Sequence, residues 1–136
     1  MSFLLFAVVV SLMLGVYMMS GQEAAASHEI SDKVTSAVSS VGTAVGSFQV
    51  RKFAHFAMYA LLGLALIAFL YVVLRSLVRA VGLAFVICLI YSLLDELHQH
   101  FVPGRDASLK DLLFDAAGYG VGVIVALVAG LLSGIL

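Results

Sequence analysis

The chain has 136 residues, of which 63% are hydrophobic and 11% are charged, and its net charge is −1. Soluble domains carry about 25% charged residues, so this composition excludes an ordinary soluble domain. It also gives no reason to expect nucleic acid as a partner, and the single cysteine, Cys88, excludes a disulfide framework.

Four apolar runs are long enough to cross about 30 Å of hydrocarbon as helices. They cover approximately residues 3–19, 50–74, 80–101 and 109–135. The sequence therefore predicts an all-α membrane protein, a bundle of four transmembrane helices in one domain, residues 1–136. We expect it to be a multi-pass protein of the cell membrane.

The first run is followed by a polar segment, residues 20–49, rich in Ser, Ala and Gly. The small residues Ala24 to Ala26 leave a cleaved signal peptide as an alternative, although no basic residue precedes Phe3. Apolar residues recur within the segment at steps of three and four. This outer loop is expected to contain an amphipathic helix or to be loosely ordered.

The second run opens with two basic residues, Arg51 and Lys52. Lys52, His55 and Tyr59 recur at helical spacing and therefore share one side of the helix. Lys52 can extend to the lipid headgroups, whereas His55 lies about one turn deeper. A histidine there is most simply a structural residue unless polar partners lie nearby.

The third run is free of charged residues only from Ala80 to Leu94, which is about 22 Å and too short to span. Continued through Phe101, the helix is long enough, and it ends before Pro103-Gly104. This continuation brings a set of polar residues to the edge of the hydrocarbon: Asp95, Glu96, His98 and Gln99.

The fourth run starts as a helix with Ser108 as its N-cap and Asp111 in its first turn. Asp115 follows one turn later on the same face. Small residues then recur every four positions and allow close approach of another helix, either within this chain or in self-association. These residues are Gly118, Gly122, Ala126 and Gly130.

Four spans place the ends of the first and third runs, and the starts of the second and fourth, on one side. The polar residues of these ends should therefore meet in one pocket. By raw count, five Lys and Arg lie on that side and only Arg75 and Arg79 on the other. Because acids offset the basic residues of the pocket, we give more weight to Arg75 and Arg79. The pocket is then expected to be extracytoplasmic.

Two motifs carry a resemblance to a known family: RKxxHFxxYxLLG from Arg51, and DELHQxFVPGRxxSxxDxxxDxxG from Asp95 to Gly118. They are similar to the VanZ-like family of small bacterial membrane proteins, linked to teicoplanin resistance. The resemblance implies a four-helix membrane domain and a role in glycopeptide tolerance of the cell envelope, but no established reaction. Met58 stands where many relatives carry Glu, and Asp115 where Asn is common.

Two classes of function fit these residues. The first is non-catalytic: ion pairs between basic and acidic residues lock the helix ends together, and the pocket binds the anionic headgroup of a membrane lipid or a lipid-linked envelope molecule. The residues expected to bind are Arg51, Lys52, Tyr59, Glu96, Gln99, Arg105 and Asp115.

The alternative is a membrane-embedded enzyme acting on a lipid-linked envelope substrate. In that case His55 and His98 form the acid/base pair, oriented by Asp95 or Asp111. We expect no cofactor. We also expect no metal, because no short ligand spacing such as HExxH is present. A metal site stays an alternative, since His, Asp and Glu donors of the right type are present.

Overall fold

The computed structural model describes residues 2–21, 33, 36, 47–102 and 109–134. The four long helices in these residues are α1 (Ser2–Ser20), α3 (Ser47–Leu74), α4 (Leu77–His100) and α5 (Leu109–Leu132). All four are long and apolar enough to span a membrane, which confirms the predicted all-α bundle. The amphipathic helix considered for the outer loop falls almost wholly outside the described residues, as do Pro103, Gly104 and Ser108.

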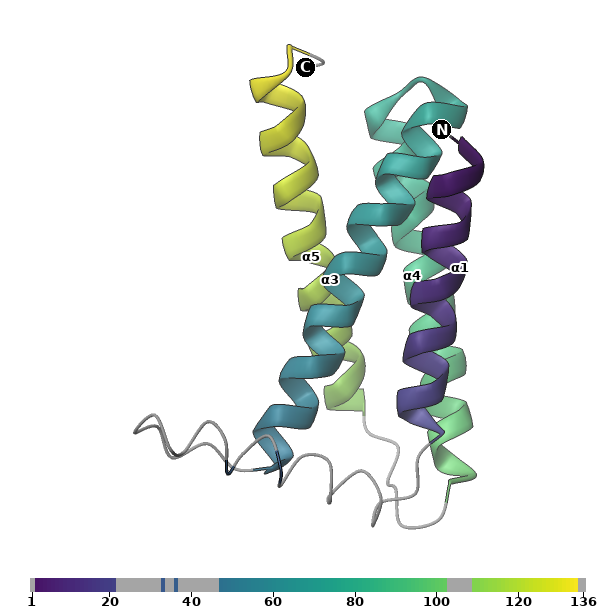
Figure 1. Cartoon of the computed structure of the whole chain (residues 1–136), viewed down its shortest axis with the longest axis vertical. Coiled ribbons are helices and arrows are strands. Elements are labelled where there is room, and N and C mark those ends of the chain that lie inside the picture. The colour runs from purple at the N-terminus through teal and green to yellow at the C-terminus, as the bar shows by residue number, and fades with distance from the viewer. Residues whose placement is uncertain (1, 22–32, 34–35, 37–46, 103–108, 135–136) are drawn as a thin grey trace.

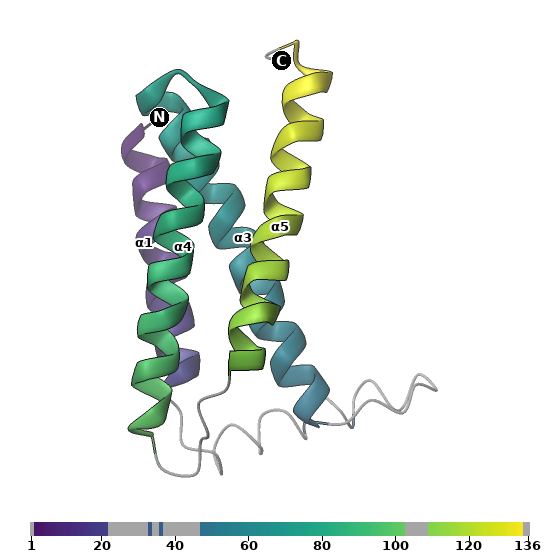
Figure 2. The same ribbon diagram turned by 180° about the vertical axis from the view of Figure 1, so that it is seen from behind.

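The helices alternate in direction (Figures 1 and 2). The last residues of α1 and α4 and the first residues of α3 and α5 therefore lie at one end of the bundle, which we call the polar end. The opposite end holds the α3–α4 connection and the end of α5. Helix α3 contacts all three other helices. The predicted convergence of the polar helix ends is present.

The connection between α3 and α4 is shorter than expected. Helix α4 begins at Leu77, not near Ala80, so that Arg79 belongs to its first turn. Arg75 adopts a left-handed conformation with φ 52°, and the Ser76 side chain accepts a hydrogen bond from the Arg79 amide at 3.5 Å. A left-handed residue followed by an N-cap serine explains how two residues suffice for the reversal.

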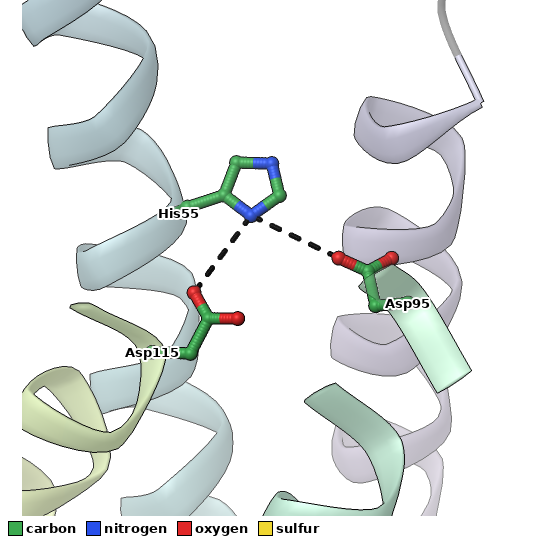
Figure 3. A group of neighbouring side chains, drawn as sticks. All are labelled: His55, Asp95 and Asp115. Carbon is green, nitrogen blue, oxygen red and sulfur yellow. Dashed lines mark ion pairs between the residues drawn. The ribbon is translucent and has the colours of Figure 1, made fainter. Parts of the chain in front are cut away.

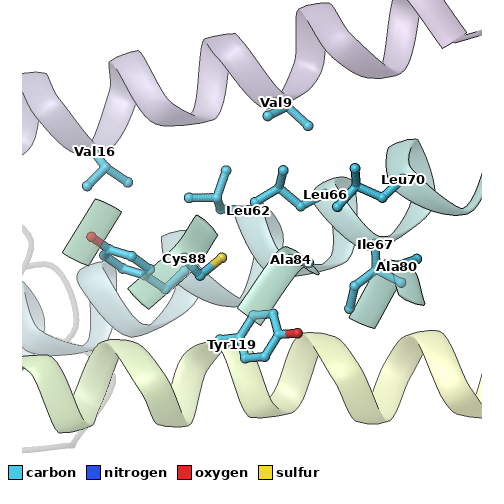
Figure 4. Close-up of a cluster of buried hydrophobic side chains, with 11 residues drawn as sticks. Val9, Val16, Leu62, Leu66, Ile67, Leu70, Ala80, Ala84, Cys88 and Tyr119 are labelled. Atoms are coloured by element: carbon cyan, nitrogen blue, oxygen red, sulfur yellow. The ribbon is translucent and has the colours of Figure 1, made fainter. Parts of the chain in front are cut away.

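The apolar core lies between α3 and its neighbours (Figure 4). Cys88 is buried in this core, as a small hydrophobic side chain would be. Many large apolar side chains point outward instead, which in hydrocarbon carries no solvation cost. The buried core residues are Val9, Val16, Tyr59, Leu62, Leu66, Ile67, Leu70, Ala80, Ala84, Cys88 and Tyr119.

Glycines allow α3 and α5 to touch backbone to backbone. A Cβ at Gly118 would overlap the Phe56 carbonyl oxygen, and one at Gly122 would lie 2.6 Å from the Ala60 carbonyl oxygen. The stripe of small residues on α5 is thus used, at these two positions, for packing within the chain. Self-association through the whole stripe stays a prediction.

Candidate functional site

Three helices bring one histidine and two aspartates together inside the polar half of the bundle (Figure 3). The Nδ1 atom of His55 on α3 lies 4.0 Å from Asp95 Oδ2 on α4 and 4.0 Å from Asp115 Oδ1 on α5. One donor atom from each residue lies within 4.8 Å of the other two. We call these three residues the His55–Asp95–Asp115 cluster.

Helical periodicity explains why both carboxylates point inward. The buried residues of α4 recur in steps of four and three, and Asp95 belongs to this stripe. On α5, Asp115 precedes Gly118 by three residues, so it shares the face that packs against α3. Asp95 is 4% exposed and Asp115 is 2% exposed. Both carboxylates are therefore removed from bulk solvent.

Hydrogen bonds fix the orientation of each carboxylate. Ser92 Oγ donates to Asp115 Oδ2 at 2.6 Å, which links α4 to α5. Gln99 Nε2 donates to Asp95 Oδ2 at 2.9 Å and to Ser20 Oγ at 3.3 Å, which links α4 to α1. All five polar side chains are buried. The orientation of both carboxylates is therefore fixed by side chains of the bundle itself.

Three buried polar atoms have no hydrogen-bond partner among the residues that the structure describes: Tyr59 Oη, Asp95 Oδ1 and His98 Nε2. Tyr59 is 1% exposed and lies one helical turn after His55. The negative charges of Asp95 and Asp115 act electrostatically on its hydroxyl. Leaving a buried polar atom unpaired costs about 1–3 kcal/mol. Tyr59 Oη and Asp95 Oδ1, which belong to the cluster or lie one turn from it, are the kind of buried atoms that water or a ligand satisfies.

Lys52 marks the outer part of the site, one turn before His55 towards the polar end. Its Nζ forms an ion pair with Asp111 of α5 and lies 5.0 Å from the centre of the Phe114 ring. The side chains of Lys52 and Asp111 keep 21% and 30% of their exposure. Asp111 therefore lies in the outer part of the site, beside Lys52, and is not a member of the buried cluster.

The two histidines expected to act as a pair have different neighbours. His55 belongs to the cluster, whereas His98 stacks on Tyr17 of α1 with ring centres 4.7 Å apart. Glu96 is half-buried, and its negative charge acts electrostatically on Asp115. The side chains of Arg51 and Arg105 lie outside the described part of the chain.

Sequence reasoning missed several residues that support the site. Ser92 could have been found, because it lies three residues before Asp95 and seven before Gln99 on the same helical face. Ser20 and Tyr17 carried no such signal, since they come from α1 and meet α4 only in the folded bundle.

Four apolar helices with a buried acidic and histidine cluster define a multi-pass membrane protein with a polar site inside its bundle. The family model described as VanZ/LLP1 matches residues 3–131, and the chain belongs to this family. No curated protein and no solved structure shows a significant match. Met58 stands at the position where many relatives carry Glu. The end of its side chain lies against α1, where a Cβ at Gly15 would be 3.0 Å from it.

Proposed function

We propose that this protein binds the anionic headgroup of a lipid or lipid-linked molecule of the bacterial cell envelope at its polar end. We propose further that this binding supports tolerance to glycopeptides such as teicoplanin. The observation that carries the proposal is the buried His55–Asp95–Asp115 cluster, with the partly exposed Lys52 one helical turn closer to the polar end. Ionisable residues inside a membrane domain are expensive and are functional by default.

Lys52 supplies the group that an anionic headgroup would contact. It is partly exposed, and its ammonium is already desolvated on one side by Phe114. A phosphate oxygen can exchange with the Asp111 carboxylate as partner of this ammonium, because both are anionic acceptors. Arg51 precedes Lys52 directly, and Arg105 precedes α5, so two further cations are near this end in sequence.

The basic residues at the opposite end of the bundle support an assignment of which end faces the cytoplasm. Arg75 and Arg79 are both exposed there, at the α3–α4 connection. Basic residues in short loops mark the cytoplasmic side. This assignment supports an extracytoplasmic polar end, where lipid-linked envelope precursors and glycopeptides meet.

A membrane-embedded enzyme is the second candidate, favoured by the placement of His55 between two carboxylates. A carboxylate beside the imidazole can fix its tautomer and stabilise its protonated form, as acid/base catalysis requires. His55 is the candidate acid/base group, and Asp95 the candidate orienting residue. Asp111 contacts Lys52, which gives it a role in the outer part of the site in either case.

Binding is tested with purified protein in nanodiscs of phosphatidylcholine, titrated with fluorescent undecaprenyl phosphate or phosphatidylglycerol. We expect saturable binding of the phosphate lipid and at least a tenfold weaker affinity in Lys52→Gln. Arg79→Gln is the matched control, because it removes one exposed cation at the opposite end. Equal affinity of Lys52→Gln and Arg79→Gln, or no preference over phosphatidylcholine, would refute the proposal.

A cell assay addresses the envelope role. Cells that depend on this protein for teicoplanin tolerance are complemented with wild type, Asp95→Asn or Lys52→Gln. The proposal expects both variants to accumulate in the membrane and to lower the tolerated teicoplanin concentration. Full tolerance with either variant would contradict it. Turnover of the labelled lipid, lost in His55→Gln, would favour the enzyme.

A further inference from the structure

We propose that the His55–Asp95–Asp115 cluster is a binding site for one divalent metal cation of the kind that accepts imidazole and carboxylate together, such as Zn²⁺ or Mn²⁺. The inference concerns the buried cluster only and does not depend on lipid binding at Lys52. It departs from the sequence expectation of no metal, which was based on the absence of a short ligand motif.

The separations between the donor atoms fit a common cation. Ligand atoms about 2.0–2.2 Å from one metal ion lie about 3–4 Å from each other. The His55 Nδ1 atom lies 4.0 Å from one oxygen of each aspartate, and all three donors lie within 4.8 Å of one another. These distances are too long for hydrogen bonds between the side chains. To hold one ion at coordinating distance, the three donors would have to approach one another by a few tenths of an ångström.

The charges of the cluster also call for a divalent cation. Asp95 and Asp115 would bring two negative charges into the bundle, and a protonated His55 would offset only one of them. Glu96 adds further negative charge near Asp115, whereas the charge of Asp111 is offset by its ion pair with Lys52. An unbalanced charge in a low-dielectric interior is costly. A divalent cation with two carboxylates and a neutral imidazole leaves the site electrically neutral.

The surroundings resemble the outer shell of a metal site. In such sites the ligating carboxylates are themselves hydrogen-bonded, which fixes their orientation. Here Ser92 donates to the far oxygen of Asp115, and Gln99 donates to Asp95. Asp95 Oδ1, buried and without a partner among the described residues, is a second oxygen that the cation can use.

The donor set selects the kind of cation. Mg²⁺ and Ca²⁺ prefer ligand sets made only of oxygen, whereas imidazole suits transition metals and zinc. Three protein ligands leave at least one coordination position open, as in catalytic zinc sites. Tyr59 lies one helical turn after His55, and its buried hydroxyl could contact a molecule bound in that position.

The test measures metal content and affinity directly. Protein purified without a polyhistidine tag is stripped with EDTA, loaded separately with Zn²⁺ or Mn²⁺, freed of excess ion and measured by plasma mass spectrometry. We expect about one ion per chain and a higher melting temperature with metal, because a ligand of the folded state stabilises it. His55→Gln and Asp115→Asn should lower the affinity at least tenfold. Ser92→Ala should lower it by about 10–100-fold, as changes next to metal ligands do.

His100→Gln is the matched control, since His100 is an exposed histidine at the same end of α4. Less than one tenth of an ion per chain in the wild type would overturn the inference. Wild-type affinity in both His55→Gln and Asp115→Asn would also overturn it.

If the cluster variants do not fold, wild-type protein loaded with Mn²⁺ is compared with His100→Gln by pulsed electron paramagnetic resonance. Nitrogen coupling from an imidazole, retained in His100→Gln, supports the site, and its absence from the wild type excludes it. Metal binding without lipid binding would refute only the proposed function. Lipid binding by EDTA-treated protein that takes up no metal would refute only the metal site.

Discussion

The packing of α3 against α5 can be tested by adding one methyl group at Gly122. A Cβ there would lie 2.6 Å from the Ala60 carbonyl oxygen and 3.0 Å from the Leu64 amide nitrogen, whereas ordinary contact begins near 3.4 Å. Both obstacles are backbone atoms, so the helices must separate. Overpacking of this kind costs about 1–3 kcal/mol. Replacing a helical Gly by Ala returns at most about 1 kcal/mol, so Gly122→Ala should be destabilised overall.

Gly120→Ala is the matched control, because a Cβ at Gly120 meets nothing within 4 Å. It changes only the helix propensity, and the protein should be as stable as the wild type or more stable. Both variants are compared by thermal unfolding in a mild detergent, where Gly122→Ala should melt several degrees lower. If Gly122→Ala melts at or above the temperature of Gly120→Ala, the close backbone contact of α3 and α5 is refuted.

Three further experiments test contacts between helices. Tyr119→Phe removes the hydrogen bond that Tyr119 Oη donates to the Val81 carbonyl oxygen at 2.6 Å, and should lower the free energy of unfolding by about 0.5–1.5 kcal/mol. An unchanged free energy would contradict this bond between α5 and α4. Ser92→Ala leaves the buried Asp115 without its serine donor and should cost about 1–3 kcal/mol, whereas Ser11→Ala, which removes an exposed bond within α1, should stay within about 0.5 kcal/mol. Equal effects of the two serine variants would show that Ser92 does not hold Asp115. A double-mutant cycle with Lys52→Met and Asp111→Leu should give a coupling energy below about 1 kcal/mol, because both side chains retain part of their exposure. A coupling energy of several kcal/mol would mean that this ion pair is shielded from water.

The four helices could be predicted because length and hydropathy decide whether a segment spans a membrane. Their alternating direction then placed His55, Asp95 and Asp115 at the same end without any motif. The boundary at Leu77 could not be predicted, because it depends on a left-handed Arg75 that ordinary residue preferences disfavour.

Which residues form the cluster was harder to predict than the end of the bundle where it lies. Asp95, His98 and Gln99 recur at helical spacing and so share one face of α4, but a helix face is wide enough to touch two neighbouring helices. In the bundle Asp95 meets His55 of α3, whereas His98 turns to Tyr17 of α1. Which side chain faces which helix is decided by packing angles, and these depend on residues such as Gly118 and Gly122 that carry no polar group.

The contact between α3 and α5 lies in the first half of α5, and beyond it α5 runs apart from α3 and α4 (Figures 1 and 2). The space between them is a groove lined mainly by apolar side chains, among them Ile67, Leu77 and Ala126. In a bilayer this groove faces hydrocarbon, so its apolar lining suits the acyl chain of a neighbouring lipid better than water. A lipid in the groove would contact α3 and α5, the helices that carry His55 and Asp115.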